Sequence, residues 1–175
     1  MKKPAILLFT TLLMLVFAGI ALAAPEPTRL IEVFRKPGVN FRPFKSVGNE
    51  ISVNIRPEGE SFFDASDPFL RERIAEMTLN AAKQQGWVLT ENSNADIRLA
   101  VKIAEWGRFR NKHDQNLMEF FTIEVNAHSR ESDGLILRAR GRYSRVDPVE
   151  ESTNQMHIEF LSIMAEILRA LQSNR

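Results

Sequence analysis

Three segments in the second half of the chain alternate apolar and polar side chains with a period of two, at residues 96–106, 117–128 and 135–146. This alternation is typical of β-strands that bury one face, because successive side chains point to opposite sides of a sheet. Ser132-Asp133-Gly134 separates the last two segments and indicates a tight turn. The chain is therefore expected to fold around an antiparallel meander of three strands.

Helical periodicity flanks this meander on both sides. Before it, apolar residues recur every three or four positions from Leu70 to Ala81. Ser66-Asp67 is expected to cap this helix, with Pro68 as its first residue. Gly86 suits the left-handed position that ends a helix.

A second helix is expected near the end of the chain. Its apolar face runs to Leu171 and is wide enough to cover a core. Ser152 and Gln155 fit a capping box at its start. Two strands, at residues 30–34 and 51–55, precede the first helix, so the expected order is β-β-α-β-β-β-α. Helices that interrupt a meander predict an α+β fold, with a mostly antiparallel sheet and both helices packed on one face.

The first residues have the layout of an export signal. Two lysines precede an apolar run that ends in small residues, and cleavage is expected after Ala23 or Ala24. A signal peptide of residues 1–24 would leave one α+β domain, residues 25–175, in the periplasm. The apolar run of about 20 residues is also long enough for an uncleaved membrane anchor, which stays the alternative.

The composition excludes several classes of site. The chain contains no cysteine, which excludes disulfides, thiolate metal sites, cysteine nucleophiles and a lipid-modified cysteine. Its 23 Lys and Arg against 22 Asp and Glu leave a formal charge of +1, which gives no support for nucleic-acid binding. Loss of Lys2 and Lys3 with the signal would leave 21 against 22, a charge of −1.

The polar face of the meander is the strongest candidate site. A simple register through the turn gives three cross-strand pairs: Glu124 with Arg142, Asn126 with Arg140, and His128 with Arg138. Five cations against Glu124 would give this face a charge of about +4, with Ile136 beside them: Arg98, Lys102, Arg138, Arg140 and Arg142. Arginine suits an anionic partner, because its planar fork matches phosphate and carboxylate groups. A sheet face that contacts only water has the same composition, so both interpretations stay open.

A second basic patch lies between the first two strands of the meander. Residues 107–116 are polar and are expected to form a connection. Arg108 and Arg110 flank Phe109 there, which suits contact with an anionic surface or a membrane interface. The tip of a solvated hairpin would have the same composition.

The sequence contains no recognisable catalytic or metal-binding pattern. It lacks a nucleophile elbow, a Walker A loop and a dinucleotide fingerprint, and its histidines lack metal-ligand spacing: His113, His128 and His157. Glu119 is the one acid on the apolar face. A position near the end of its strand, beside the connection, explains an acid there. A pocket that joined Glu119 to His113 or His128 would instead favour a hydrolase. We expect no enzyme activity, no cofactor and no metal.

Two phrases of the sequence resemble small exported envelope proteins. The first is KPGVNFRPFKSV, residues 36–47, which leads into a strand. The second is Gly86-Trp87-Val88-Leu89, followed by Ala95-Asp96-Ile97-Arg98-Leu99 at the opening of a strand. This order is similar to that of uncharacterised bacterial lipoproteins, including the YajG-like group, although the lipid-anchored cysteine of that group is missing here. The resemblance implies an envelope accessory protein and supplies no catalytic residues.

These observations favour a non-enzymatic periplasmic protein that binds another envelope component through the basic face. The expected partner is an envelope protein or an anionic lipid or glycan, with peripheral membrane contact as a further option and nucleic acid excluded. The alternative is a module for a small ligand or lipid, with a pocket between helices and sheet near Phe62, Phe121 and Phe160.

Overall fold

The computed structural model describes residues 27–55, 69–110, 117–131, 134–147 and 155–172. The expected signal peptide, residues 1–24, lies outside these residues. The described part contains seven strands and two helices: β1 (Thr28–Arg35), β2 (Ser46–Gly48), β3 (Ser52–Ile55), α2 (Leu70–Gln84), β4 (Val88–Thr90), β5 (Ile97–Arg110), β6 (Leu117–Ser129), β7 (Leu135–Asp147) and α3 (Gln155–Gln172).

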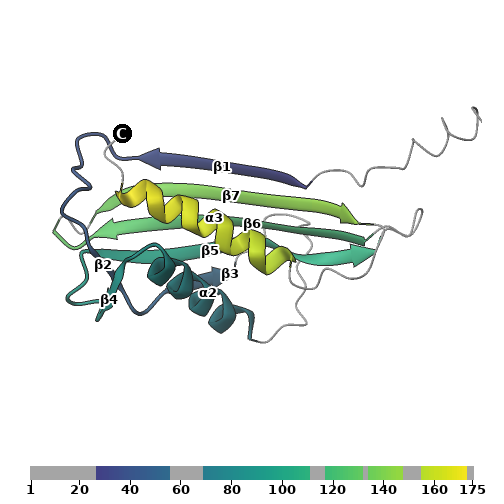
Figure 1. Ribbon diagram of the computed structural model, residues 1–175, viewed down its shortest axis with the longest axis horizontal. Helices are drawn as coiled ribbons and strands as arrows, with labels where there is room; N and C mark the ends of the chain where they lie inside the picture. The colour runs from purple at the N-terminus through teal and green to yellow at the C-terminus, as the bar shows by residue number, and fades with distance from the viewer. Residues whose placement is uncertain (1–26, 56–68, 111–116, 132–133, 148–154, 173–175) are drawn as a thin grey trace, which may run out of the picture.

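The strands form one sheet in the order β1-β7-β6-β5-β2-β4, with β3 paired to β5 as well (Figure 1). The four long strands pair antiparallel, and the short strands β2, β3 and β4 pair parallel. Both helices lie on the same face of the sheet (Figure 1). The expected α+β class is confirmed, and β2 and β4 are short strands that the sequence pattern did not indicate.

Strand β5 is longer than expected, and it contains a bulge. Its register against β6 shifts between Ile103 and Glu105, so Ala104 is an extra residue in the ladder. The bulge reverses the alternation, and Trp106 joins Ile103 on the buried side. Residues 107–110, expected as part of a connection, therefore continue the strand to Arg110.

The β6–β7 hairpin contains a second bulge and has a different register from the one expected. Glu124 pairs with Arg140 and Asn126 with Arg138, two residues away from the expected partners, while His128 pairs with Leu135. The extra residue in β7 is Ile136, and the shift lies between Ala127 and His128. The expected register was therefore wrong, although a shift of two residues keeps each arginine on its expected face.

The first helix ends as predicted but begins later. The N–H groups of Gly86 and Trp87 donate to the carbonyls of Lys83 and Ala82 in a Schellman motif, with Gly86 at a φ of 80°. At the other end Phe69 occupies the N-cap position and makes no side-chain cap hydrogen bond. The expected capping residues Ser66, Asp67 and Pro68 lie outside the described residues, as does Ser152 before α3.

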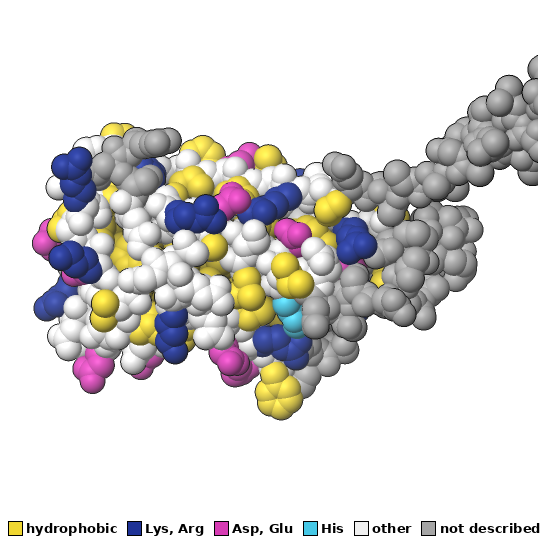
Figure 2. Space-filling model, viewed as in Figure 1, with side chains coloured by type: hydrophobic (Ala, Val, Ile, Leu, Met, Phe, Trp, Pro, Cys, Tyr) yellow, Lys and Arg dark blue, Asp and Glu magenta, His cyan; other side chains and the backbone are white. Residues whose placement is uncertain are grey.

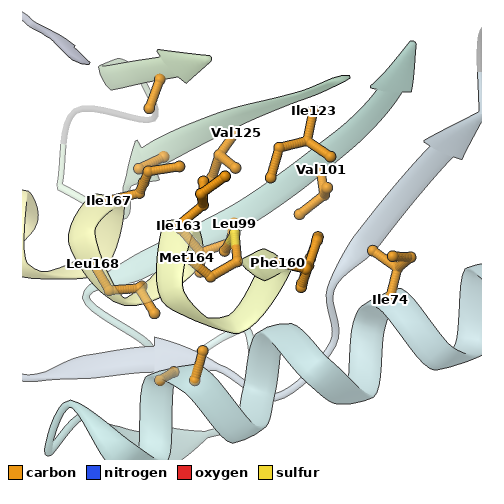
Figure 3. Packing of buried hydrophobic residues seen from close by; sticks show 14 of the residues in the cluster. Ile74, Leu99, Val101, Ile123, Val125, Phe160, Ile163, Met164, Ile167 and Leu168 are labelled. Carbon is orange, nitrogen blue, oxygen red and sulfur yellow. The ribbon is translucent and has the colours of Figure 1, made fainter. Parts of the chain in front are cut away.

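The core lies between the helices and the sheet. Side chains of α3 point toward the central strands, where Phe160, Ile163 and Met164 meet Ile123 and others (Figure 3). Ile136, expected on the polar face, is 1% exposed, because the bulge lets it and Leu137 both turn inward. Among the described residues, neither helix is long and apolar enough to cross a membrane.

Candidate functional site

The face of the sheet opposite the helices carries the predicted basic residues. Arg138, Arg140 and Arg142 are exposed along β7, and Arg98 and Lys102 extend the set along β5. We call this surface the uncovered face. The structure therefore brings together five of the seven residues predicted to bind a partner.

Charges of opposite sign alternate across this surface. One row runs over four strands: Glu32 of β1, Arg140 of β7, Glu124 of β6 and Lys102 of β5. The next row contains Leu30, Arg142, Thr122 and Glu105, and the Thr122 hydroxyl donates to the Glu105 carboxylate. Glu32 and Glu105 thus join Glu124 on this face.

The net charge of the uncovered face is smaller than the expected +4. The uncovered face has five cations and three carboxylates, which gives it a formal charge of +2. Glu105 was missed because the bulge at Ala104 moves it to this side, and Glu32 was missed because the sequence does not indicate that β1 pairs with β7. Arg138 lies near one of the acids, with its Nε 3.6 Å from Glu124 Oε1.

Strand β1 also adds exposed apolar side chains to this surface. Phe34, opposite Arg138, is 62% exposed, and Leu30, opposite Arg142, is 48% exposed. The opposite, helix-bearing surface shows basic and acidic side chains interspersed, without a large area of one sign (Figure 2). Exposed apolar side chains therefore lie next to arginines at the β1–β7 edge of the uncovered face.

Arg108 does not belong to this surface. It lies in β5 on the helix side, and its guanidinium forms an ion pair with Glu119, which is fully buried. The expected basic loop patch was therefore wrong for Arg108, because the bulge turns this residue inward. Arg110 is the last residue of β5 and pairs with Leu117 in the backbone register.

Glu119 has cationic neighbours on both sides in the sheet. It is opposite Arg108 of β5 and Arg145 of β7. The next row on the same side is aromatic, with Trp106, Phe121 and Tyr143 stacked at centroid distances of 5.4 Å. The partner of Glu119, which the sequence did not indicate, is therefore arginine, and the two residues form a charge pair within the sheet.

One of the two expected histidine partners of Glu119, His128, is separated from it by the sheet. His128 pairs with Arg98 on the uncovered side, whereas Glu119 is buried on the helix side. His157 of α3 stacks on Trp106 at 6.3 Å between ring centroids, and His113 lies outside the described residues. Over the described ranges, no group of three or more His, Asp or Glu side chains is arranged to hold a metal.

Aromatic rings fill the region where a ligand pocket between helices and sheet was the alternative. Phe121 and Phe160 are fully buried and touch edge to face at 6.0 Å between centroids, and Trp106 packs on both. Phe62, the third residue of that prediction, lies outside the described residues. Pockets formed by the described residues lie along β1 and at the ends of the sheet.

Comparison with known proteins gives a likeness of fold only. No family model matches the sequence, and no curated protein matches it. Among solved structures, PelC from Paraburkholderia phytofirmans, which is a dodecamer, is similar at a TM-score of 0.53 and 16% identity, over 85% of this chain and 100% of that chain. A second crystal form gives 0.53 and 14%, with the same coverage.

A weaker likeness links the chain to a lipoprotein from Neisseria meningitidis. The TM-score is 0.46 at 8% identity, over 73% of this chain and 99% of that chain. A TM-score this low supports no inference about this protein, and the YajG-like resemblance stays a prediction. The chain therefore shares its fold with PelC, at identities that show the fold alone.

Proposed function

We propose that the protein is a non-enzymatic accessory protein of the bacterial cell envelope that binds another envelope component through the uncovered face. The observation that carries this proposal is the β1–β7 edge of that face. Exposed Phe34 and Leu30 lie next to Arg138, Arg140 and Arg142 there. Aromatic residues and arginine are the side chains most enriched in binding surfaces.

The mixed composition favours binding over simple solvation. Phe34 and Leu30, 62% and 48% exposed, lie on the same face of one strand, so this edge presents two apolar side chains beside arginines rather than a single scattered one. A partner that covers this edge would bury apolar area and would also pair with the arginines, which gives affinity and orientation together. The envelope location is supported by the signal-like pattern of residues 1–24.

The proposal is tested by site-specific photo-crosslinking in bacteria that express the full chain. A photoreactive phenylalanine analogue replaces Leu30 on the uncovered face, and a control replaces Ile158, which is 54% exposed on α3. We expect an adduct of defined mass from position 30 and none from position 158. Equal adducts from both positions, or none from position 30, would contradict the proposal.

A charge variant separates the arginines from the apolar contacts. In the background with the probe at position 30, the triple substitution Lys102→Gln, Arg140→Gln and Arg142→Gln should lower the adduct yield about tenfold, the loss expected for roughly 1.4 kcal/mol of binding energy. The matched control removes three exposed cations of the helices: Arg71→Gln, Lys83→Gln and Arg169→Gln. The control should keep the yield, and both variants should keep the thermal melting temperature within a few degrees.

A further inference from the structure

Strand β1 forms one end of the sheet and, among the described strands, pairs with β7 alone (Figure 1). Its eight residues pair in a continuous register and include no proline. An edge of this kind presents a row of backbone groups to a further strand, and proteins commonly blunt such edges by shortening, bulging or interrupting them. The strand at the other end, β4, has only three residues. Of the two ends, β1 is therefore the one suited to pairing.

The pairing of β1 with β7 determines which of its backbone groups point outward. The Lys36 N–H donates to the Ile136 carbonyl at 2.9 Å and so continues this ladder by one residue. Backbone groups alternate between the two sides of an antiparallel strand, so the even-numbered residues of β1 bond to β7. The N–H and C=O groups of Arg29, Ile31 and Val33 therefore point away from the sheet.

Exposed apolar side chains lie on both faces of β1. Leu30 and Phe34, on the uncovered face, are 48% and 62% exposed, and Val33, on the helix side, is 37% exposed. Side chains directly opposite each other on neighbouring strands lie about 5 Å apart. A strand added at this edge would therefore cover part of all three side chains while it bonds to the backbone.

The charges of β1 limit how a second copy of the strand can pair with it. Two identical antiparallel strands pair about a two-fold axis, and the middle of β1 offers Ile31 or Glu32 as the residue at that axis. With Glu32 at the axis, its carboxylate lies opposite a second Glu32 and Arg29 lies opposite Arg35, and like charges in these positions are destabilising. With Ile31 at the axis, no like charges lie opposite each other.

The register with Ile31 at the axis also continues the alternation of charge on the uncovered face. Glu32 is then opposite Leu30 of the second copy, whose own neighbour on β7 is Arg142. In the first copy the neighbour of Glu32 on β7 is Arg140. Glu32 would therefore lie in a row between an arginine of its own chain and an arginine of the second copy, which is a complementary arrangement.

We propose that β1 pairs antiparallel with β1 of a second copy, with Ile31 at the two-fold axis, so that two sheets join into one. The outward backbone groups of Ile31 pair with those of the second Ile31, and the groups of Arg29 pair with those of Val33. Two-fold dimers are the commonest closed assemblies of identical chains. The inference goes beyond the proposed function and does not rest on it, because a second copy at this edge extends the uncovered face rather than covering it.

The absence of cysteine allows the axis to be located by disulfide formation in the purified protein. Single cysteines replace the residues from Leu30 to Phe34 one at a time, and Ile158→Cys on α3 reports random collision. Opposite residues of an antiparallel pair have Cα atoms about 4.5–5.5 Å apart, within disulfide range, whereas diagonal neighbours are about 7–8 Å apart. We expect Ile31→Cys to form a covalent dimer at least about tenfold faster than the other positions.

Two substitutions at one position test the pairing without a cysteine. In the proposed register Val33 lies opposite Arg29 of the second copy, so Val33→Lys creates like-charge contacts and Val33→Glu creates contacts of opposite charge. Both variants lose the same apolar side chain. The dimer dissociation constant from sedimentation equilibrium should be at least about fivefold higher for Val33→Lys than for Val33→Glu. The matched pair Ile158→Lys and Ile158→Glu should not differ, and circular dichroism confirms that each variant is folded.

A monomer at every concentration up to about 1 mM would overturn the dimer, as would equal disulfide rates at positions 31 and 158. Fastest disulfide formation elsewhere in β1, or equal dissociation constants for the two Val33 variants, would overturn the register. The photo-crosslink at position 30 separates this inference from the proposed function. An adduct of twice the mass of the chain supports the second copy, and a monomeric protein that gives an adduct of another mass would leave the proposed function without the dimer.

Discussion

At the scale of single residues, the charge pair of Glu119 and Arg108 is the most informative contact. Glu119 is fully buried, and Arg108 of the neighbouring strand pairs with it. Breaking a buried pair on one side leaves an uncompensated charge, whereas replacing both partners by apolar residues costs little. The unfolding free energy of variants at these two positions therefore distinguishes a buried charge pair from a solvent-exposed Arg108.

Arg108→Met should destabilise the protein by about 3 kcal/mol in urea unfolding. The double variant Arg108→Met, Glu119→Leu should recover most of this loss, because no buried carboxylate remains. If Arg108 were instead part of an exposed basic loop, the single variant would change the unfolding free energy by less than about 0.5 kcal/mol.

Tyr143 reports on the same region. Burial raises the pKa of the Tyr143 phenol above 10.0, and the nearby Glu119 carboxylate raises this pKa further, against an opposing effect of Arg145. The neutral phenol therefore contributes stability in full below pH 10, and this contribution is lost as the pH rises through the folded-state pKa.

The chain has one tyrosine, so absorbance near 295 nm titrates this group alone. The folded protein should ionise with a midpoint above 10, and Glu119→Gln should move the midpoint down toward 10. A midpoint at 10 in the native protein, confirmed as folded by far-UV circular dichroism, would contradict the buried position of the phenol.

Gly141 of β7 packs closely against Ile163 of α3. A Cβ atom there would lie 2.5 Å from Ile163 Cγ2 and 3.3 Å from Ile123 Cγ1. Gly141→Ala should therefore cost about 1–3 kcal/mol through overpacking, although alanine is otherwise preferred to glycine in a strand. In an Ile163→Ala background the same substitution should cost almost nothing, which a double-mutant cycle measures. Equal costs in both backgrounds would exclude the steric explanation.

At the scale of secondary-structure elements, Asp96 joins the start of β5 to β2. Its Oδ2 accepts hydrogen bonds from the Lys45 N–H at 2.8 Å, the Ser46 N–H at 2.9 Å and the Ser46 hydroxyl at 2.8 Å. The Asp96 N–H donates back to the Ser46 hydroxyl at 3.0 Å. These residues belong to the two phrases that resemble exported envelope proteins, so the two phrases meet in one structural contact.

Asp96→Asn should lower the unfolding free energy at pH 7 by about 2 kcal/mol, since it weakens charge-assisted hydrogen bonds. Burial raises the pKa of Asp96, but the hydrogen bonds from Lys45 and Ser46 lower it by more, so the folded-state pKa lies below 3.8. The stabilisation is therefore complete above pH 3.8 and is lost as the pH falls through the folded-state pKa. Urea titrations at several pH values should show this acid-side loss in wild type and its absence in Asp96→Asn.

The elements themselves were predictable where their pattern is local. Period-two alternation identified the three long central strands, and Gly86 identified the end of α2. The two bulges were not predictable, because a single extra residue leaves no signature when its neighbours suit either face. The bulge in β7 accounts for the inward position of Ile136, and the bulge in β5 accounts for the misassigned Arg108. The hairpin register was wrong from its first pair, because His128 pairs with Leu135 rather than with Arg138.

At the scale of the whole molecule, the sheet has one face under the two helices and one without them. The sequence predicted this arrangement, since both helices have a single apolar stripe and the meander has one polar face. It did not predict that β1 lies beside β7, because pairing between strands over 100 residues apart has no local signal. That pairing supplies Glu32, Leu30 and Phe34 to the uncovered face, and it adds a carboxylate and two apolar side chains to a surface expected to be mainly basic.

The central claim is that this face is covered in the cell, and the absence of cysteine permits a direct measurement. Leu30→Cys on the uncovered face and Ile158→Cys on α3 are about equally exposed, at 48% and 54% for the native residues. Each variant is labelled with a small maleimide, once as purified protein and once in intact bacteria. The account predicts that cysteine at position 30 reacts more slowly in bacteria than in the purified protein, relative to cysteine at position 158. Equal relative rates in the two settings would contradict it.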